Sequence, residues 1–312
     1  MEPLGAWSGD LPDAPAPVLD AGSVVVDNQI YAIGGKLPDS HISDVYIYDP
    51  GDPVTAADDR WLSGPSYPVA VENPAVVGYD GQIYVFGGST APFSGAVRTA
   101  AVLDPSAAEP KWEAIANIPA ARGGATAQVL DGTIYLIGGM SQRGRSVNWV
   151  DAYDPLTNRW NRLAPNLQTR RDNPGSAVVD GKIYVFGGRM RNADRSVVDA
   201  TLQSLEIFDP LTGEWTYGAD MPTGRRALSV GTLNDRIQAI GGEAGPDNSA
   251  FREVEEYDPL TDTWRSLAPI TTPRHGAAFG SIDDIIYVLM GGPQAGSAFT
   301  DAVEGFSLSN PL

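Results

Sequence analysis

Short apolar runs recur six times along the chain, and each ends in a glycine doublet. The runs are QIYAIGG (29–35), QIYVFGG (82–88), TIYLIGG (133–139), KIYVFGG (182–188), RIQAIGG (236–242) and IIYVLMGG (285–292). The tyrosine of this run, replaced by Gln238 in the fifth copy, recurs at intervals of 49 to 54 residues. A repeat of about 50 residues indicates an array of equivalent structural units.

Each unit is predicted to contain four short β-strands. A strand rich in small residues precedes the glycine-doublet run, and an Asp-Gly turn such as Asp80-Gly81 joins the two as a hairpin. A third strand ends at an aromatic-Asp-Pro sequence such as 153–155, because proline removes a ladder donor. The fourth strand carries a tryptophan, which is Trp61, Trp112, Trp160, Trp215 or Trp264. Helical periodicity is absent from this pattern, so four-stranded sheets arranged radially as a β-propeller are predicted.

The glycine doublet, the aromatic-Asp-Pro sequence and the spaced tryptophan together resemble the kelch repeat over essentially the whole chain. We therefore expect an all-β, six-bladed kelch-type β-propeller with four-stranded antiparallel blades, forming one domain over residues 1–312. The last unit departs from the repeat, because Met290 precedes its doublet as an extra residue and no tryptophan follows Phe306. The segment WSGDLP at 7–12 is similar to WNRLAP at 160–165. An N-terminal strand at about residues 6–12 is therefore predicted to complete blade six and close the ring.

Charge and composition exclude several classes of function. The net charge is −18, with 39 acidic and 21 basic residues, which argues against a nucleic-acid or anionic-membrane binder that acts through bulk charge. The chain has no cysteine, so disulfides and thiolate chemistry are excluded. No apolar stretch approaches the roughly 18 residues that span a bilayer. We expect a monomer that does not insert into membranes, and the compartment stays open.

Motifs for metal or cofactor chemistry are not found in the sequence. His41 and His275 are the two histidines, and neither has a second ligand at a metal-binding spacing. Aspartates such as Asp194, Asp199 and Asp247 are scattered through loops without a recognisable calcium-binding loop. The glycine doublets end strands and do not open helices, so they do not predict phosphate binding. No metal and no cofactor are expected.

The two faces of the predicted propeller differ in charge. In a four-stranded meander, the connections from strand two to three and from strand four to the next blade lie on one face, which we call the loop face. Its segments hold 14 basic and 12 acidic residues, a net charge of +2, whereas the remainder of the chain is at −20. Long loops on a rigid scaffold commonly carry binding residues. A ligand site is therefore predicted on this face.

An arginine column marks the start of the first strand in four of the six units. The arginines are Arg122, Arg171, Arg225 and Arg274, and valines 18 and 71 take this position in the first two units. The resemblance to kelch proteins that recognise acidic peptides implies that these four guanidinium groups contact a ligand at the channel mouth. Arginine forks suit carboxylates and phosphates. A structural role, in which each arginine satisfies backbone carbonyls or aspartates between blades, is the alternative.

Further binding residues are expected in the loops after the glycine doublets. They include Arg143, Arg145, Arg189, Arg191, Arg195 and Arg252, with Trp149, Phe93, Phe251, Phe299, Met140 and Met190 among them. Aromatic residues beside arginines are typical of binding surfaces. Trp149 lies outside the tryptophan column of the fourth strand, so packing between blades does not automatically account for it. The alternative is that it covers the outer part of a neighbouring loop. Our leading hypothesis is a non-enzymatic module that binds an acidic peptide or an anionic small molecule at this face.

The resemblance also implies an enzymatic alternative. Bacterial kelch propellers include sialic-acid mutarotases, in which a glutamate after a glycine and a nearby arginine act on the sugar acid. The segment GGEAGPDNSAFR places Glu243 and Arg252 in a similar relation. Glu243 would then act as the acid/base, and Arg252 or Arg225 would anchor the substrate carboxylate. A solvated loop carboxylate is the other interpretation of Glu243.

Overall fold

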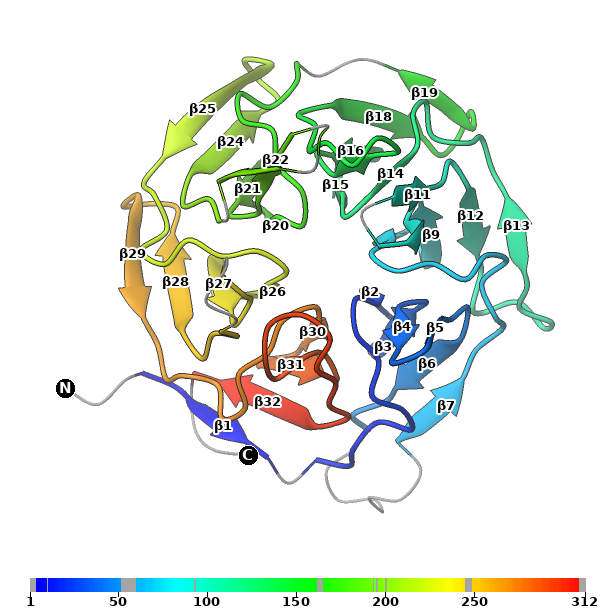
Figure 1. The fold of residues 1–312 in the computed structure, drawn as a ribbon, viewed down its shortest axis with the longest axis horizontal. Coiled ribbons are helices and arrows are strands. Elements are labelled where there is room, and N and C mark those ends of the chain that lie inside the picture. Colours follow the sequence, from blue (N-terminus) through cyan, green and yellow to red (C-terminus); the bar gives the residue numbers. More distant parts are fainter. Residues whose placement is uncertain are drawn as a thin grey trace.

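Six four-stranded sheets stand around a common axis in the computed structural model of the chain (Figure 1). The structure describes residues 4–9, 11–51, 60–92, 94–161, 165–192, 194, 196–199, 201–244 and 249–308. All sheets are antiparallel, and the strands of five blades pair in chain order from the axis outward, whereas the outer strand of the sixth comes from the N-terminal end of the chain. The predicted all-β propeller with six four-stranded blades is confirmed.

Each blade runs from an inner strand beside the axis to an outer strand at the rim. Blade one is β2 (Gly22–Val26), β3 (Gln29–Ile33), β6 (Val45–Tyr48) and β7 (Trp61–Ser63), and blade two is β8 (Ala75–Tyr79), β9 (Gln82–Phe86), β12 (Ala100–Leu103) and β13 (Trp112–Ala114). Blade three is β15 (Thr126–Leu130), β16 (Thr133–Ile137), β18 (Val150–Asp154) and β19 (Arg159–Asn161), and blade four is β20 (Gly175–Val179), β21 (Lys182–Phe186), β24 (Leu205–Asp209) and β25 (Glu214–Gly218). Blade five is β26 (Ser229–Leu233), β27 (Arg236–Ile240), β28 (Val254–Asp258) and β29 (Thr263–Ser266), and blade six is β30 (Ala278–Ile282), β31 (Ile285–Leu289), β32 (Val303–Ser307) and β1 (Ala6–Ser8).

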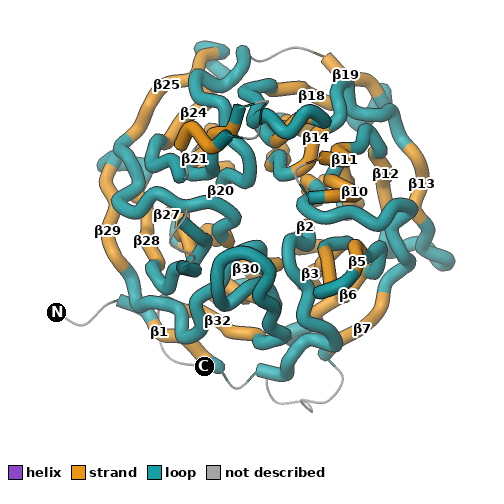
Figure 2. The backbone as a smooth tube through the Cα atoms, viewed as in Figure 1, coloured by secondary structure: helices purple, strands orange, loops and turns teal. Residues whose placement is uncertain are grey.

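Short two-stranded ladders lie in the loops above four of the blades. They are β4 (Lys36–Leu37) with β5 (Ser40–His41), β10 (Ser89–Ala91) with β11 (Ser94–Ala96), β14 (Arg122–Gly123) with β17 (Met140–Ser141), and β22 (Met190–Arg191) with β23 (Val197–Asp199). Figure 2 shows these loop segments crossing over the blades around the axis. They order much of the loop face, where the site is expected.

The N-terminal strand closes the ring as predicted. Residues of β1 pair antiparallel with β32, and Trp7 lies opposite Phe306 with ring centroids 5.1 Å apart. The strand is shorter than the predicted 6–12, because it ends at Ser8. The rim of blade six is thus built from the first described residues of the chain, and both ends of the described chain lie at this rim (Figure 1).

The tryptophan column ties each blade to the one before it. Every indole N–H of the column donates to a backbone carbonyl in the connection from the preceding blade. The pairs are Trp7 with Ala268, Trp61 with Pro12, Trp112 with Pro65, Trp160 with Ala116, Trp215 with Pro165 and Trp264 with Ala219, at 2.8–3.3 Å. An indole therefore combines apolar burial with a fixed inter-blade hydrogen bond, which explains why the repeat carries tryptophan at the rim.

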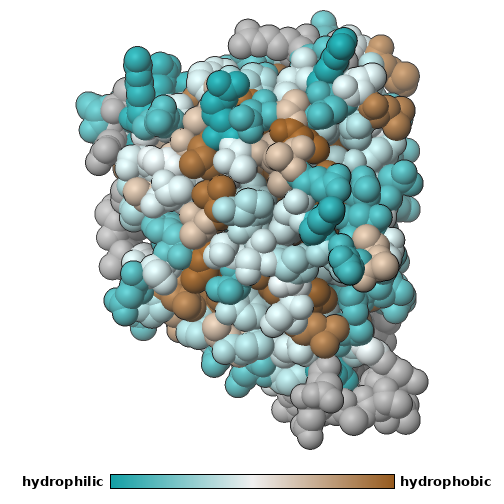
Figure 3. All heavy atoms as spheres, turned by 90° about the vertical axis from the view of Figure 1, so that its right-hand side faces the viewer, coloured by the Kyte–Doolittle hydropathy of each residue, from teal (hydrophilic) through white to brown (hydrophobic). Residues whose placement is uncertain are grey.

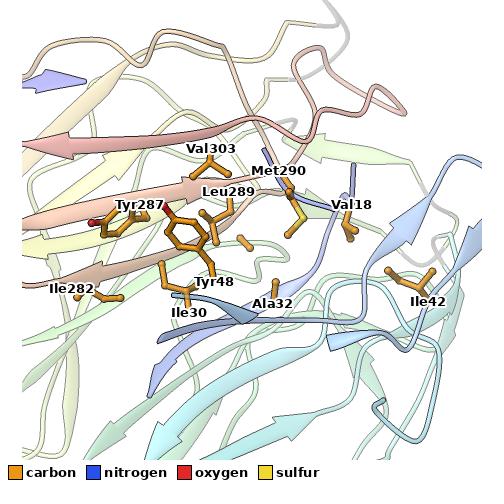
Figure 4. Packing of buried hydrophobic residues seen from close by; sticks show 12 residues of the cluster. Val18, Ile30, Ala32, Ile42, Tyr48, Ile282, Tyr287, Leu289, Met290 and Val303 are labelled. Carbon is orange, nitrogen blue, oxygen red and sulfur yellow. The ribbon is translucent and has the colours of Figure 1, made fainter. Parts of the chain in front are cut away.

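Met290 is not an extra residue, contrary to the sequence prediction. It has a φ of 58° and Gly291 has a φ of 97°, which match the 63° and 98° of the doublet Gly34-Gly35 in blade one. Met290-Gly291 therefore takes the place of the doublet, and Gly292 takes the next position, where blade one has Lys36. A left-handed methionine is strained, and here its side chain is 1 % exposed in an apolar cluster with Val18 and Leu289 (Figure 4).

Apolar contacts between neighbouring sheets form the core. Between blades six and one, the rings of Tyr48 and Tyr287 lie 5.6 Å apart beside Ile30 and Ile282 (Figure 4). On the rim that faces the viewer in Figure 3, hydrophobic residues lie in separate groups between hydrophilic ones. In the described part of the chain, no helix has the length and apolar character needed to cross a membrane.

Candidate functional site

The four column arginines are buried inside their blades. Their side chains are 0–1 % exposed. Each guanidinium donates to main-chain carbonyls at the end of the second strand and just before the third strand of its blade. Arg171, for example, donates to the carbonyls of Gly187 at 2.8 Å and Ser204 at 3.0 Å, and to Glu206 Oε1 at 2.8 Å.

An acidic residue on the third strand neutralises each of these arginines. The pairs are Arg122 with Asp151, Arg171 with Glu206, Arg225 with Glu255 and Arg274 with Glu304. Burial lowers the pKa of Arg171, and the charge of Glu206 opposes this effect. Arg225 and Arg274 have lowered pKa values for the same reason, burial. Guanidinium groups remain charged in proteins in spite of such shifts.

The expected ring of arginines at the channel mouth is therefore wrong in its geometry. Arg122, Arg171, Arg225 and Arg274 point into the blades and hold main-chain carbonyls, so they do not present donors to a ligand. Of the two roles left open by the sequence, the described contacts match the structural one. Breaking such a buried pair leaves an uncompensated charge, which is strongly destabilising.

A circle of backbone hydrogen bonds runs around the axis just above the inner strands. One residue of each blade donates its N–H to the carbonyl of the equivalent residue in the preceding blade. The members are Asp20, Asn73, Gly124, Asn173, Ala227 and Gly276, with N···O distances of 2.7–3.0 Å and φ between 50° and 62°. Left-handed backbone suits glycine, asparagine and aspartate. We call this circle the girdle.

The girdle lies at the boundary between two cavities on the axis. Below it, a cavity of about 230 Å³ is lined by the innermost strands of the blades. Above it, a cavity of about 180 Å³ opens toward the loop face, and we call this one the central cavity. Asp20, Asn73, Gly124 and Asn173 contribute to the lining of both.

Charged side chains from several blades converge on the central cavity. On one wall, Lys36 Nζ lies 3.0 Å from both Asp20 Oδ2 and Glu72 Oε2. Burial acts to lower the pKa of Lys36, but the two carboxylates outweigh it and the pKa is raised. Lys36 is therefore held as an ammonium between two acids from blades one and two.

Two arginines from neighbouring blades form the opposite wall of the central cavity. Arg189 Nη2 lies 2.8 Å from Asp172 Oδ1, and Arg226 Nη2 lies 2.6 Å from Glu243 Oε1. Burial lowers the pKa of Arg226, and so does the positive charge of Arg189. Arg226 keeps 19 % of its side chain exposed.

His275 completes this wall from blade six. Its Nε2 lies 2.9 Å from the carbonyl of Gln294, which only accepts, so Nε2 is the donor in this contact. Its Nδ1 lies 3.6 Å from Glu243 Oε1 and is a buried atom without a hydrogen-bond partner. The ring fits because the opposing residue is Gly292, where an added Cβ would lie 2.5 Å from Nε2.

A second hollow lies over blade three, and the charged residues in its described lining are all arginines. Arg143, Arg145, Trp149 and Arg170 line it together with Ala120 and Ala121 of the preceding connection, and its volume is about 440 Å³. We call it the Trp149 groove. Its lining contains no aspartate or glutamate among the described residues. In a chain of net charge −18, this is a local concentration of positive charge.

The loop that builds the Trp149 groove is anchored from below. The guanidinium of Arg122 lies 5.7 Å from the Trp149 ring centroid in a cation–π contact and donates to the Trp149 carbonyl at 3.2 Å. Val147 donates its N–H to Gly139 O at 2.8 Å and accepts from Arg171 N at 3.1 Å. The buried arginines Arg122 and Arg171 thus support the loop of the groove, and neither is part of the groove lining.

The remaining predicted site residues have mixed positions. Met140, Arg189 and Glu243 line the central cavity, and Trp149 lines its own groove. Arg252 is exposed and donates from Nε to Ile270 O at 2.9 Å, as Arg98 does to Ile118 O at 2.8 Å. Arg252 therefore ties a connection in place and does not lie in the lining of the central cavity. Phe93, Arg195 and Asp247 lie outside the described residues.

The sequence prediction missed most of the central cavity. Asp20, Lys36, Glu72, Asp172, Arg226 and His275 were not proposed as site residues. Two positions of the repeat would have indicated them, the residue after each glycine doublet and the residues directly after the arginine column. No group of three or more histidine, cysteine, aspartate or glutamate side chains is placed to hold a metal ion in the part of the chain that the structure describes.

The fold is a six-bladed β-propeller with two hollows on its loop face, the central cavity and the Trp149 groove. A family model described as the KLHDC2/KLHL20/DRC7 Kelch-repeats domain matches residues 73–292, and a Kelch motif model matches residues 17–66. The first of these covers more than half of the chain. The chain belongs to the kelch-repeat family.

Several curated proteins are similar to the chain. Kelch-like protein terF of Aspergillus terreus is 28% identical over 242 residues, which are 73% of this chain and 50% of that protein. Kelch-like protein 15 of Danio rerio is 30% identical over 240 residues, 70% of this chain and 37% of that protein. Beta-scruin of Limulus polyphemus is 26% identical over 201 residues, 62% of this chain and 21% of that protein. The chain thus spans half or less of these relatives.

Proposed function

We propose that this kelch-repeat propeller is a protein-interaction module that binds an acidic segment of a partner in the Trp149 groove. Membership in the kelch-repeat family and similarity to Kelch-like proteins support an interaction module. We choose an acidic partner because of the charge of the groove. Arg143, Arg145 and Arg170 line it, and the described lining contains no acidic residue. Guanidinium forks bind carboxylates bidentately.

The shape of the groove suits a short peptide segment. Its volume of about 440 Å³ falls within the roughly 300–1,000 Å³ of known ligand pockets. Trp149 offers an apolar surface that is held by Arg122 below it. Tryptophan and arginine are the residue types most often found as energetic centres of interfaces. A partner residue that follows an acidic one can therefore pack on the indole.

Peptide selection tests this proposal without a known partner. A random peptide display library is selected on the purified protein, and the enriched peptides are labelled and measured by fluorescence anisotropy. We expect enrichment of aspartate and glutamate, and loss of binding in the triple variant R143Q/R145Q/R170Q. The matched control is Arg159→Gln, an exposed arginine on β19 of the same blade, which should bind like the parent. Enrichment without acidic residues, or full binding by the triple variant, would contradict the proposal.

A small-molecule isomerase is the second candidate, and one observation favours it. Glu243 is 3 % exposed and lies beside Arg226 and His275 in the central cavity. The small volume of about 180 Å³ weighs against enclosure of a nine-carbon sugar acid. Anomer interconversion of sialic acid, followed by NMR, is the direct assay. A rate equal to that in buffer would dispose of this candidate.

A further inference from the structure

A buried serine joins the loop of blade three to that of blade four. Ser146 is 0 % exposed, and its N–H donates to the carbonyl of Arg191 at 3.1 Å. In return, the N–H of Arg191 donates to Ser146 Oγ at 2.9 Å. The hydroxyl itself donates to Asp172 Oδ2 at 2.5 Å. Ser146 therefore crosses the boundary between the two blades through both its backbone and its side chain.

Asp172 divides its two carboxylate oxygens between the two blades. Oδ2 accepts from Ser146, which belongs to the lining of the Trp149 groove. Oδ1 accepts from Arg189 Nη2 at 2.8 Å, and both Asp172 and Arg189 line the central cavity. The side chain of Asp172 is 2 % exposed, so both hydrogen bonds form at low dielectric, where they are stronger than in water. The two hollows are therefore connected through this buried carboxylate.

The other blades show that the fold does not require a hydroxyl at the position of Ser146. In blade three this position directly precedes Val147, whose N–H donates to Gly139 of the glycine doublet at 2.8 Å. By the same rule, the position in blades one, two, four, five and six is occupied by His41, Ala96, Thr201, Ala250 and Phe299. Alanine thus fits this position in two blades, so the contact of Ser146 with Asp172 is a feature of blade three itself.

A comparable contact lies between blades one and two, away from the Trp149 groove. His41 Nε2 is 3.6 Å from Glu72 Oε2. Glu72 is equivalent to Asp172, because each directly follows the column position of its blade and pairs through its backbone with the residue after the glycine doublet. Neither His41 nor Glu72 belongs to the described lining of the groove. This pair provides a matched control for the contact of Ser146.

The loop that Ser146 fixes carries the residues that form the groove. Arg145 precedes Ser146 and Trp149 follows three residues later, and all three line the groove. The Arg145 carbonyl accepts from Ser141 N at 2.9 Å, which closes the hairpin that bears Arg143. A displacement of Ser146 would therefore move both the guanidinium groups and the indole of the groove.

We propose that Ser146 and Asp172 are positioning residues for the Trp149 groove, and that Asp172 couples the groove to the central cavity. The Ser146 hydroxyl holds the groove loop against Asp172, and Arg189 in the wall of the central cavity holds Asp172 in turn. Contiguous hydrogen bonds of this kind can carry energetic coupling between two sites. The position of Trp149 can be measured without a ligand, whereas the effect on binding rests on the proposed function of the groove.

Fluorine NMR of the full chain, labelled with 5-fluorotryptophan, tests the positioning role. The chain has seven tryptophans, and the Trp149 signal is the one that disappears in Trp149→Phe. Ser146→Ala should shift or broaden this signal and leave those of the rim tryptophans in place. Ser146→Thr should restore the parent signal, since threonine occupies the equivalent position in blade four. The matched control His41→Ala should leave the Trp149 signal unchanged.

Asp172→Asn tests whether Ser146 acts through Asp172. The amide has one acceptor oxygen in place of two, so it cannot accept from both Ser146 and Arg189. It should move the Trp149 signal as Ser146→Ala does, and the double variant S146A/D172N should move it no further than the larger single effect. Affinity for the selected acidic peptide should fall about fivefold in all three variants, the loss expected for one hydrogen bond. Thermal melts show whether each variant is folded.

Three results would overturn the proposal. They are an unchanged Trp149 signal in folded Ser146→Ala, an equal change in His41→Ala, and strictly additive changes in the double variant. The failure of this proposal and that of the proposed function can be told apart. If no peptide is selected, the Trp149 signal still tests the positioning role, and an unmoved signal leaves peptide binding in the groove standing.

Discussion

Arg170 and Arg171 are neighbours in the sequence but lie in different environments. Arg171 is 0 % exposed and bonds to Glu206 and two carbonyls inside blade four. Arg170 lines the Trp149 groove, where no acidic residue contributes to the described lining. The difference follows from position, because Arg171 belongs to the arginine column and Arg170 is the residue before it. Arg171 therefore stabilises the blade, whereas its neighbour Arg170 is available to bind a partner.

The same division recurs at Arg225 and Arg226. Arg225 is buried and forms an ion pair with Glu255, whereas Arg226 lies in the wall of the central cavity beside Glu243. Recurrence of an arginine within a repeat thus indicates a structural role, and an arginine that breaks the repeat is the better candidate for a site. Stability and binding measurements can separate the two kinds of arginine.

Removal of the buried arginine should have the largest effect. Arg171→Ala leaves the carboxylate of Glu206 buried at 0 % exposure without its partner, and we expect a loss of about 3–5 kcal/mol in the free energy of unfolding. Arg170→Ala should change it by less than about 0.5 kcal/mol. Urea unfolding at neutral pH measures both.

A double variant checks the cause of that loss. Replacing both members, as R171L/E206L, should recover part of the stability, because no uncompensated charge remains, whereas the carbonyls of Gly187 and Ser204 still lose their donor. Equal stability of Arg171→Ala and Arg170→Ala would show that burial does not separate the two arginines.

Truncation of Trp149 should give the next largest effect, on binding. Trp149→Ala is expected to weaken binding of the selected acidic peptide by roughly 2 kcal/mol, about 30-fold, because an interfacial tryptophan commonly contributes that much binding free energy. Anisotropy titration measures the affinity, and Trp160→Ala at the rim of the same blade is a control that should affect stability instead. An unchanged affinity in Trp149→Ala would remove the groove from the proposal.

Added salt should distinguish the groove arginines from the buried arginines through a smaller effect. Between about 50 and 500 mM NaCl, affinity for the acidic peptide should fall several-fold, because exposed charges are screened. The unfolding free energy should change little, since buried pairs such as Arg225 with Glu255 are screened less. Peptide affinity that is independent of salt would argue for apolar contacts as the main source of binding.

Replacing exposed aspartates in the turns of the face opposite the loop face should have the smallest effect, a change in how stability depends on pH. The pKa of Asp154 is lowered mainly by the Thr157 hydroxyl, that of Asp209 by Lys182 and that of Asp258 by Arg236. A lowered folded-state pKa stabilises the protein above the ordinary value of about 3.9, and this contribution is lost as the pH falls through the lowered value.

The triple variant D154N/D209N/D258N should therefore depend less on pH below about 4 than the parent protein. Thermal melts across the acidic range, from about pH 2 to neutrality, measure this dependence. Identical pH profiles for the two proteins would show that these turns do not contribute to acid sensitivity.

The blade repeat was predictable from sequence because each feature of it has a local cause. Asp80-Gly81 adopts the left-handed backbone that a tight hairpin needs, and each rim tryptophan bonds to the preceding blade. The exception is Met290, which adopts the conformation of a glycine because its side chain fills an apolar cluster. That substitution depends on tertiary packing, which the sequence pattern does not display.

The candidate site was only partly predictable, for a different reason. Trp149 was proposed because it breaks the repeat, and it lines the Trp149 groove. The column arginines were misplaced because their acidic partners, such as Glu206, which lies 35 residues after Arg171, are on the third strand. The partners were nevertheless visible as a pattern, since acids occupy this position in the four blades with arginine, and Tyr46 and Ala101 occupy it in the two blades with valine.

The girdle has a consequence for how the chain is cut and joined. The strand that holds the first described residues lies at the rim of blade six, whereas the girdle around the axis is continuous from blade to blade. The hydrogen bonds around the axis therefore do not depend on which blade contains the break in the backbone. A circular permutant opened at another rim should keep the same axial architecture.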